Sequence, residues 1–326
     1  MVKKLFFITG RGRSGTWLLK SILDSHPKIS VAPESIFILQ LYNKYGKIKE
    51  WGDFRIRAFV NDLSKDKKIS GWWDIDLSEL QHFIIHRNPE SYREVCQSVY
   101  EYYAKVHNKD SAHVVGDKNP EYSIKLLNLS KIFPESVFII LTRDPRDNIS
   151  SYMNVDFDLN NPYSLAARWN FFHRRIFVAQ SKLKDKVLLV RYEDLIIDPK
   201  NTLKKICEKT GIDYDPQILN FYKNPKNVFR WNSKIQQKIS LDNVYKWKNL
   251  KSQTVNRKIT KLCLDYIHRL DYEDCEDINI SFIEMLQYYK GYFVSYLELL
   301  FYLLPLNLTQ LILSFYRKKN KTFFGL

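Results

Sequence analysis

The fold is decided by one stretch near the start of the sequence, Leu5-Phe6-Phe7-Ile8-Thr9-Gly10-Arg11-Gly12-Arg13-Ser14-Gly15-Thr16-Trp17-Leu18-Leu19. Its first residues are apolar and typical of a buried β-strand, its middle is a glycine-rich loop, and its end is typical of the first turn of a helix. A loop in this position directs several backbone N–H groups and the positive end of a helix dipole towards one small volume. The stretch therefore predicts a binding site for a phosphate group.

The loop departs from the most familiar phosphate-binding motif at one position. Gly10 and Gly15 have the spacing of the P-loop of nucleoside triphosphatases, GxxxxGK[ST]. Thr16 stands where that motif has its lysine, and the cation lies inside the loop instead, as Arg13. This departure indicates a phosphate-bearing ligand that is handled without the usual lysine and metal chemistry of ATP hydrolysis.

A second segment has the same strand-to-helix form. Val137–Thr142 is apolar and typical of a buried strand, and Arg143 follows it directly. Pro145 suits the first position of a helix with Asp144 as its N-cap, so Ser151 falls about two turns along that helix. Because open parallel sheets bind ligands beyond the carboxyl ends of their strands, Arg143 is expected in the same crevice as the first loop. Two anion sites at one sheet edge predict a ligand with two phosphate-like groups.

Together these motifs resemble those of sulfotransferases that use 3′-phosphoadenosine-5′-phosphosulfate (PAPS). The similarity covers roughly residues 3–250, is weak between about 40 and 110, and is closest to tyrosylprotein sulfotransferases and their bacterial relatives. The further matching segments are Leu23-Asp24-Ser25-His26-Pro27, Pro33-Glu34-Ser35, Gly116-Asp117-Lys118-Asn119-Pro120, Ile132-Phe133-Pro134, Arg191-Tyr192-Glu193-Asp194-Leu195, Asp198-Pro199, Ser240-Leu241-Asp242 and Lys246-Trp247.

The resemblance implies roles for particular residues. The first loop would hold the 5′-phosphosulfate and the second segment the 3′-phosphate, which makes PAPS the implied sulfuryl donor, with no metal. The implied catalytic residues are Arg13 for the leaving phosphate, Glu34 as the base and Lys118 beside the transferring group. The implied cofactor-binding residues are Arg13, Ser14, Gly15, Thr16, Trp17, Arg143, Ser151, Tyr192, Ser233 and Lys246.

Several of these residues also have an ordinary structural explanation. Glu34 is well placed to begin a helix, where the dipole favours a carboxylate, and Lys118 fits an exposed surface lysine. Trp17 replaces a second threonine found in many relatives, so packing is its expected role, and Arg11 is expected at the entrance of the site. Trp72-Trp73 fits either an acceptor pocket or the core.

Strand and helix patterns alternate along the chain, which predicts an α/β fold with a P-loop-like parallel sheet flanked by helices. Further strands are expected at 28–32, 114–115 and 187–190, further helices at 120–133, 163–183 and 199–210, and a mainly helical, aromatic-rich region at 36–110. A sulfotransferase domain is expected over 1–275, followed by an apolar helical C-terminal extension over 276–326.

The extension is almost wholly apolar from Tyr292 to Tyr316 and ends in Arg317-Lys318-Lys319-Asn320-Lys321. Pro305 and nearby polar residues divide it into two pieces, each shorter than the ~20 residues of a membrane-spanning helix. Two interpretations stay open. The helices lie in a membrane interface with the basic cluster against anionic headgroups, or they form a hairpin packed on the domain or on a second copy.

The composition of the chain limits the ligands, partners and compartment that are expected. The net charge of +15 and the isoelectric point near 9.4 suit an anionic cofactor or an anionic membrane surface. Nucleic acid is not expected as a partner, because lysines and arginines are dispersed and no nucleic-acid-binding motif occurs. The cysteines are too scattered for a zinc site, and no metal is expected. No secretory signal precedes the first strand, so the protein is expected in the cytoplasm or at the inner face of the membrane.

These observations predict a PAPS-dependent sulfotransferase that moves a sulfuryl group in line to a hydroxyl or amine acceptor, with Glu34 as base. The expected acceptor is a glycan, a glycolipid or a small molecule, and protein tyrosine enters through the resemblance alone. Two alternatives stay open. A P-loop nucleotide kinase or phosphotransferase is disfavoured by the missing lysine and by the Arg143 and Ser151 site, and the other alternative is a non-catalytic, membrane-docked nucleotide-binding protein.

Overall fold

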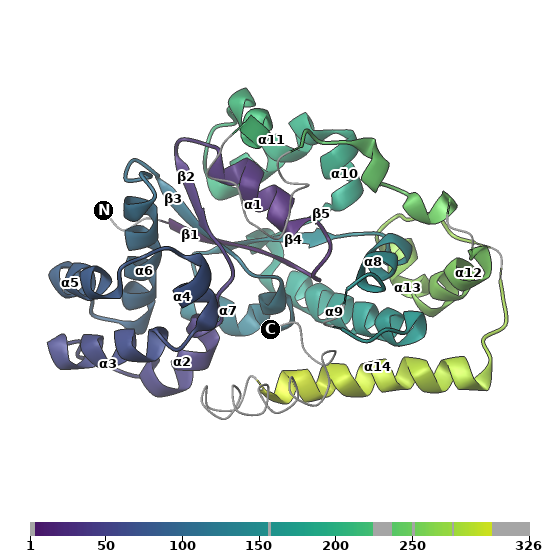
Figure 1. The fold of residues 1–326 in the computed structure, drawn as a ribbon, viewed down its shortest axis with the longest axis horizontal. Helices are drawn as coiled ribbons and strands as arrows, with labels where there is room; N and C mark the ends of the chain where they lie inside the picture. Colours follow the sequence, from purple (N-terminus) through teal and green to yellow (C-terminus); the bar gives the residue numbers. More distant parts are fainter. Residues whose placement is uncertain (1–3, 156–157, 224–236, 250–251, 276, 302–326) are drawn as a thin grey trace.

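The computed structural model describes residues 4–301 except 156–157, 224–236, 250–251 and 276. Its centre is a five-stranded, all-parallel sheet in the order β2-β3-β1-β4-β5. The strands are β1 (Lys4–Gly10), β2 (Ile29–Ala32), β3 (Val114–Lys118), β4 (Val137–Thr142) and β5 (Val187–Arg191). The predicted α/β fold with a parallel sheet is confirmed, and the glycine-rich loop follows the central strand (Figure 1).

The alternating side chains of β1 pack into two separate cores. Phe6 and Ile8 point to one face, which is covered by α1 (Thr16–Asp24), α10 (Tyr192–Ile197) and α11 (Pro199–Thr210). Leu5 and Phe7 point to the other face, covered by α6 (Tyr92–Val106), α7 (Leu126–Ile132) and α9 (Pro162–Leu183). A strand that is buried on both faces reads as a continuous apolar run, which explains the sequence of β1.

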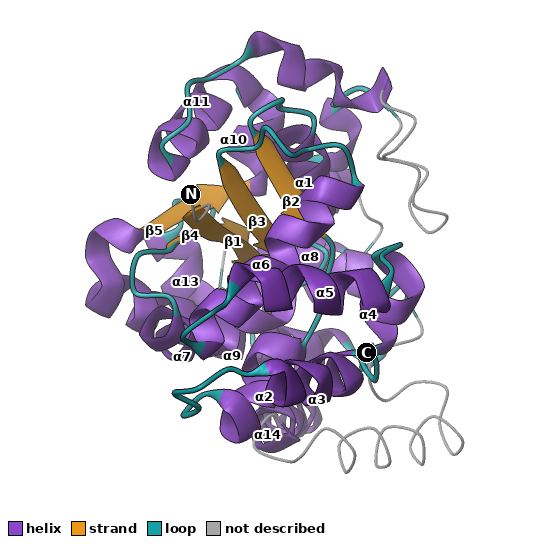
Figure 2. Ribbon diagram, turned by 90° about the vertical axis from the view of Figure 1, so that its left-hand side faces the viewer, coloured by secondary structure: helices purple, strands orange, loops and turns teal. Residues whose placement is uncertain are grey.

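The region at 36–110 is helical, as predicted, and it builds most of the second core (Figure 2). It comprises α2 (Phe37–Tyr45), α3 (Asp53–Leu63), α4 (Lys67–Trp72) and α5 (Leu77–Arg87), followed by α6. Trp73 is fully buried and its ring contacts those of Tyr100 and Tyr103, so this tryptophan belongs to the core. Its neighbour Trp72 is only partly buried.

Two predicted boundaries are wrong, each for a tertiary reason. β3 continues past Gly116 to Lys118, and a side chain at Gly116 would overlap the ring of Phe6. The glycine therefore permits close packing and does not end the strand. The helix expected at 120–133 is divided into a 3₁₀ segment (Pro120–Lys125) and α7, and the buried hydroxyl of Ser123 bonds to Pro120 O and Gly10 O.

The chain then completes the domain with shorter elements and one long helix. These are α8 (Pro145–Tyr152), α12 (Gln253–Leu262), α13 (Leu264–Arg269), α14 (Phe282–Phe301) and 3₁₀ segments at Lys184–Lys186, Pro216–Lys223, Leu241–Asn243 and Lys246–Asn249. The predicted N-cap of α8 is confirmed, because the Asp144 side chain accepts from Arg146 N at the start of the helix.

The helix α14 runs along α9 at the base of the molecule (Figure 1). A side chain at Gly291 would overlap Ser164 O, and Ser164 Oγ donates to Gln287 O at 2.6 Å, so the two helices touch through their backbones. The first part of the predicted extension is thus packed on the domain. Pro305 and the basic cluster at 317–321 lie outside the described residues, and the boundary at 275 stays a prediction. Within residues 4–301 as described, no helix is long and apolar enough to cross a bilayer.

Candidate active site

The loop after β1 has the shape that its glycines predict. Gly10 has φ +134° and lies so close to β4 that a Cβ would overlap the carbonyl oxygen of Leu141. Gly15 has φ +89°, caps α1 and leaves no room for a Cβ against the ring of Tyr192. Both conformations favour glycine. The backbone can therefore turn sharply between β1 and α1, with the helix N-terminus directed at the space beyond the sheet edge.

The helix α8 holds this loop from the side. Asn148 Nδ2 donates to Gly12 O at 2.9 Å and to Ser14 Oγ at 3.1 Å. Arg13 Nε donates to Ser151 Oγ at 3.1 Å, so the two predicted anion sites are joined by a direct hydrogen bond.

Arg143 spans the same space from the end of β4. Its Nη1 donates to Arg13 O at 3.3 Å, its Nη2 donates to Asn243 O at 2.8 Å, and its guanidinium lies 4.8 Å from the ring centroid of Tyr192. The buried Nε of Arg143 has no hydrogen-bond partner among the described residues. An unpartnered guanidinium N–H beside a second arginine indicates a place for an anionic oxygen.

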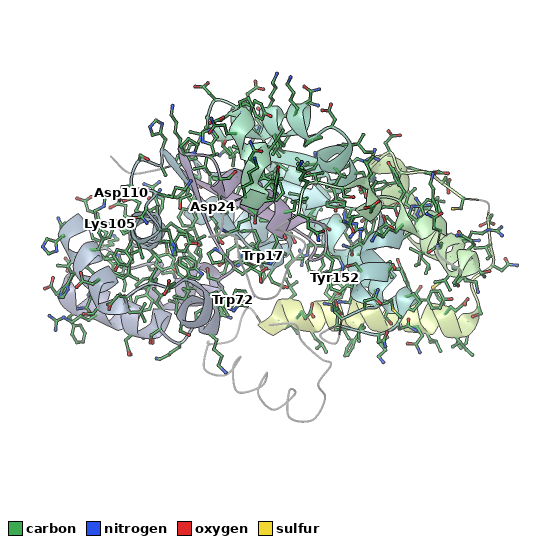
Figure 3. The ribbon with its side chains drawn as sticks, turned by 45° about the horizontal axis from the view of Figure 1, so that its top comes forward. Trp17, Asp24, Trp72, Lys105, Asp110 and Tyr152 are labelled. Atoms are coloured by element: carbon green, nitrogen blue, oxygen red, sulfur yellow. The ribbon has the colours of Figure 1, made fainter. Side chains whose placement is uncertain are left out.

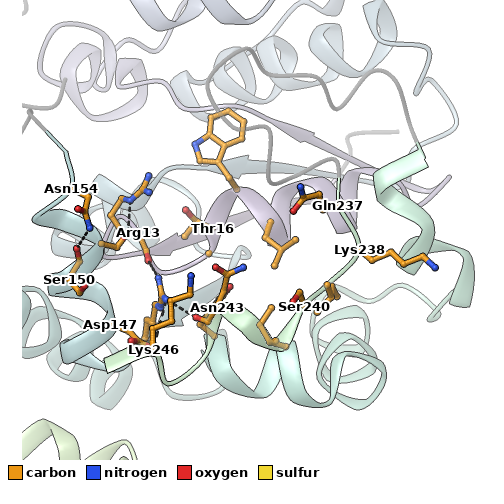
Figure 4. Close-up of a pocket in the computed structure, with 18 residues that line it drawn as sticks. Arg13, Thr16, Asp147, Ser150, Asn154, Gln237, Lys238, Ser240, Asn243 and Lys246 are labelled. Carbon is orange, nitrogen blue, oxygen red and sulfur yellow. Dashed lines mark hydrogen bonds and ion pairs between the residues drawn. The ribbon is translucent and has the colours of Figure 1, made fainter. Parts of the chain in front are cut away.

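These residues surround a pocket of about 460 Å³ (Figure 4), within the usual size of a site for a nucleotide-like ligand. The predicted residues that line it are Arg13, Gly15, Thr16, Trp17, Arg143, Ser151, Tyr192 and Lys246. Ser14 is buried behind the loop, and Ser233 lies outside the described residues. Lys238 adds a fourth cation and Asp147 is the one carboxylate of the described lining, so the pocket suits a ligand with several negative charges.

Glu34 and Lys118 meet beside this pocket at the ends of neighbouring strands. Ala32 of β2 pairs with Asp117 of β3, which brings the two following side chains together. Lys118 donates to Glu34 Oε1, and Lys68 donates to Glu34 Oε2 at 3.0 Å. Lys118 is fully buried, so the alternative of an exposed surface lysine is wrong.

The electrostatics of this cluster are unusual. Burial by itself would raise the pKa of Glu34, but the charges and hydrogen bonds of Lys118 and Lys68 outweigh it and lower the pKa to about 2. Burial lowers the pKa of Lys118 to about 7, although the carboxylate of Glu34 opposes this. Glu34 is therefore ionised at neutral pH, and Lys118 is poised between its charged and neutral forms.

Trp17 separates this cluster from the pocket. The indole lines the pocket, while Lys118 Nζ lies 3.4 Å from its ring centroid. Neither Glu34 nor Lys118 lines the pocket itself. Trp17 and Trp72 lie side by side with ring centroids 6.3 Å apart (Figure 3), so two indoles border the Glu34 cluster.

Comparison with known proteins identifies the family. The model of the sulfotransferase family matches residues 6–216, which cover the glycine-rich loop, Glu34, Lys118, Arg143 and Ser151. The chain belongs to the sulfotransferase family.

Individual relatives are distant. The chain is 26% identical over 228 residues to protein-tyrosine sulfotransferase 1 of Danio rerio, covering 66% of this chain and 55% of that protein. It is 23% identical over 257 residues to protein-tyrosine sulfotransferase A of Caenorhabditis elegans, covering 74% of this chain and 60% of that protein. The chain thus spans little more than half the length of these two relatives.

Among solved structures, the sulfotransferase domain from the olefin synthase of Synechococcus PCC 7002 is similar in fold. Its TM-score is 0.55 at 22% sequence identity, with 85% of this chain and 96% of that domain covered. This likeness supports the sulfotransferase fold for the chain. The chain also has the C-terminal helix α14, besides the sheet and the helices that cover it.

Lys68 is a site residue that the sequence did not reveal. It lies on the short helix α4, whose N-cap Asp66 accepts from both Ile36 N and Lys68 N. At the other end of α4, Trp73 Nε1 donates to Glu34 O at 3.3 Å. The helix thus contacts the Glu34 segment through backbone and side chain. The only available signal was Lys67-Lys68 in the region where the resemblance is weak, and a lysine pair alone does not indicate a site.

One of the two other arginines near the site, Arg11, is placed differently from expectation. Arg11 does not line the entrance, because it is buried, bonded to Asp158 at 3.3 Å and stacked on the ring of Tyr152. Arg146, for which no site role was predicted, is buried against Asp144. Among the residues that the structure describes, no cluster of histidine, cysteine, aspartate and glutamate could hold a metal ion.

Proposed function

We propose that this chain is a sulfotransferase that moves a sulfuryl group from PAPS to a hydroxyl or amine acceptor. The observation that carries the proposal is the convergence of two anion sites, Arg13 with the glycine-rich loop and Arg143 with Ser151, on one pocket beside the Glu34–Lys118 pair. A nucleotide with phosphate groups at both its 3′ and 5′ positions needs two such sites.

The pocket residues then have distinct tasks. The backbone N–H groups of Ser14, Gly15 and Thr16, with the N-terminus of α1, hold the 5′-phosphosulfate, and Arg13 stabilises the charge that grows on the leaving phosphate. Arg143 and Ser151 hold the 3′-phosphate. Tyr192, which packs between Gly15 and Arg143, contacts the adenosine. PAPS supplies the sulfuryl group.

Glu34 is the proposed base, and Lys118 is proposed to contact the transferring sulfuryl group. Proton transfer requires a carboxylate within hydrogen-bond reach of the acceptor, and Glu34 is the ionised carboxylate next to the pocket. Two lysines make it a weak base in this structure. When Lys118 turns to the transferring group, one of these cations leaves Glu34 and its basicity rises, so deprotonation of the acceptor is tied to the presence of the donor.

The class of acceptor is proposed from the two tryptophan side chains beside Glu34. Trp17 and Trp72 border the Glu34 cluster, and flat indole faces suit the apolar faces of sugar rings or other ring-shaped alcohols. A glycan, glycolipid or small-molecule acceptor is therefore proposed. Two relatives are named protein-tyrosine sulfotransferases, so tyrosine belongs in the same test panel.

Ligand identity is the direct test. A ligand that binds only the folded state stabilises it by about 2.7 kcal/mol at a hundredfold excess over Kd. PAPS and 3′,5′-ADP should raise the melting temperature accordingly, and ATP with magnesium should do much less. Radiolabelled PAPS with extracts of the source organism should then label the acceptor. Stabilisation by ATP with magnesium alone would favour a phosphotransferase.

A further inference from the structure

The inner face of α14 packs against the domain. Gly291 lies against Ser164, and Ser295 is buried. Four side-chain contacts continue along the helix: Glu284 pairs with Lys258, Tyr163 OH donates to Glu284, Asn170 donates to Tyr288 OH, and Arg168 donates to Glu298. Contacts therefore fix the helix to the domain along its length. Its outward side does not pack into the same core.

The outward side of α14 is nonetheless apolar over its whole described length. Its large exposed hydrophobic residues are Phe282, Ile283, Leu286, Tyr289, Phe293, Tyr296 and Leu300, exposed by 49–78%. From Phe282 onwards they recur every three or four residues, so they form one continuous stripe. Lys290 is the one exposed charged residue among the described residues of this face. A contiguous apolar face of this kind marks an interaction surface.

We propose that this stripe, the outer face of α14, docks onto an anionic membrane surface, with the helix lying in the plane of the interface. Phenylalanine and tyrosine side chains are favoured at the boundary between headgroups and acyl chains. The sequence that follows has the charge that such a surface requires. After Glu298 it contains no acidic residue, and Arg317-Lys318-Lys319-Asn320-Lys321 supplies four cations.

Charge decides between a membrane and a second copy of the chain. The protein carries a net charge of +15, and the only exposed charge on the described outer face of α14 is that of a lysine. Two such surfaces repel one another, whereas an anionic bilayer attracts each of them. The docking would bring the domain to a membrane through the outer face of α14.

The experiment is vesicle sedimentation of the full-length chain. Vesicles of phosphatidylcholine alone are compared with vesicles that also contain phosphatidylserine, at low and high salt. We expect binding to the anionic vesicles, weakened by salt because the basic residues are screened. The double variant Tyr289→Glu with Phe293→Glu should reduce binding about tenfold or more, because it places two carboxylates in the interface at exposed residues of the stripe.

A matched control comes from a different helix. Phe54 on α3 is 83% exposed, so Phe54→Glu adds a carboxylate at an exposed aromatic residue outside α14 and should bind vesicles like the unchanged chain. The melting-temperature shift with 3′,5′-ADP shows in each variant that the domain is folded. Equal vesicle binding by the double variant overturns the proposal. So does a dimer, measured by sedimentation velocity without vesicles, that the double variant abolishes.

Discussion

The ammonium nitrogen of Lys118 lies 3.4 Å from the centroid of the Trp17 ring, under an indole that also forms part of the wall of the pocket. The same lysine is bonded to Glu34 on its other side. One tryptophan thus closes off the acid–base pair from the pocket in which the donor is expected. For Lys118 to reach a transferring group, either the indole or the lysine must move.

The first prediction concerns pH. Burial lowers the pKa of Lys118 to about 7. As pH rises through this value, the lysine of the free protein loses its proton, so kcat/KM should fall on the alkaline side of neutrality. In the pH profile of kcat, the same decrease should occur at higher pH than in the profile of kcat/KM, because the bound anionic donor favours the charged lysine. Lys118→Arg stays charged and should lose this alkaline limb. A flat kcat/KM profile in the unchanged chain would contradict the assignment.

Trp17 should help to set the pH at which Lys118 loses its proton. Trp17→Ala admits water to Lys118, which reduces the effect of burial and moves the alkaline limb of kcat/KM to higher pH. Trp17→Phe keeps a ring over the lysine and should leave the limb near its original position. If both variants shift the limb equally, the ring is not what desolvates the lysine.

Glu34→Gln separates binding from chemistry. The amide cannot accept a proton, so turnover should fall about 100-fold or more while 3′,5′-ADP binding stays nearly intact. Glu208→Gln, an exposed change on α11, is the control for a lost carboxylate. Because removing one partner of a buried ion pair also destabilises a protein, melting curves are compared first. Equal loss of binding and turnover would assign Glu34 to the fold or to the cofactor.

Lys68→Met tests the positioning of Glu34. Loss of one of its two cations raises the pKa of Glu34 from about 2 towards its usual value, so the acidic limb of the rate profile moves to higher pH. Misplacement of the carboxylate should also lower kcat about tenfold or more. Lys67→Met changes the exposed neighbour on α4 and should do neither. Lys68→Arg, which keeps the charge, should restore most of the activity. A loss of stability with an unchanged pH profile would reduce Lys68 to a structural residue.

Arg143→Ala should weaken 3′,5′-ADP binding by about 1.5–3 kcal/mol, the range for hydrogen bonds to a charged group. Isothermal titration calorimetry measures this directly. Arg57→Ala, an exposed arginine on α3, controls for the change in net charge. Unchanged affinity in Arg143→Ala would remove the second anion site from the proposal.

Local signals account for what the sequence predicted well. The glycines of the first loop, the Asp144–Pro145 start of α8 and the Pro199 to Gly211 limits of α11 each follow from the chain's own geometry within a few residues. The parallel sheet and the shared crevice of Arg13 and Arg143 follow from general rules for α/β folds.

Long-range packing accounts for what the sequence missed. Lys68 reaches Glu34 across 34 positions, and Arg11 meets Asp158 across 147, and no short-range pattern marks either pair. The contact of the Trp17 ring with Lys118 likewise joins helix α1 to the end of strand β3. The sheet edge could be predicted, but the environment that sets the pKa values of the acid–base pair could not.

The contact between α9 and α14 has a consequence for biosynthesis. Ser164 meets Gln287 across 123 positions, and all five strands precede residue 192. At ~5–20 residues per second, about 6–25 seconds pass between synthesis of these two residues. From the synthesis of Arg191, which ends β5, until that of Gln287, the nascent chain contains all five strands and the glycine-rich loop, while α14 is not yet there to cover the side of α9 that receives Gly291. Among the helices that the structure describes, the last to be translated is the one that covers this side of α9.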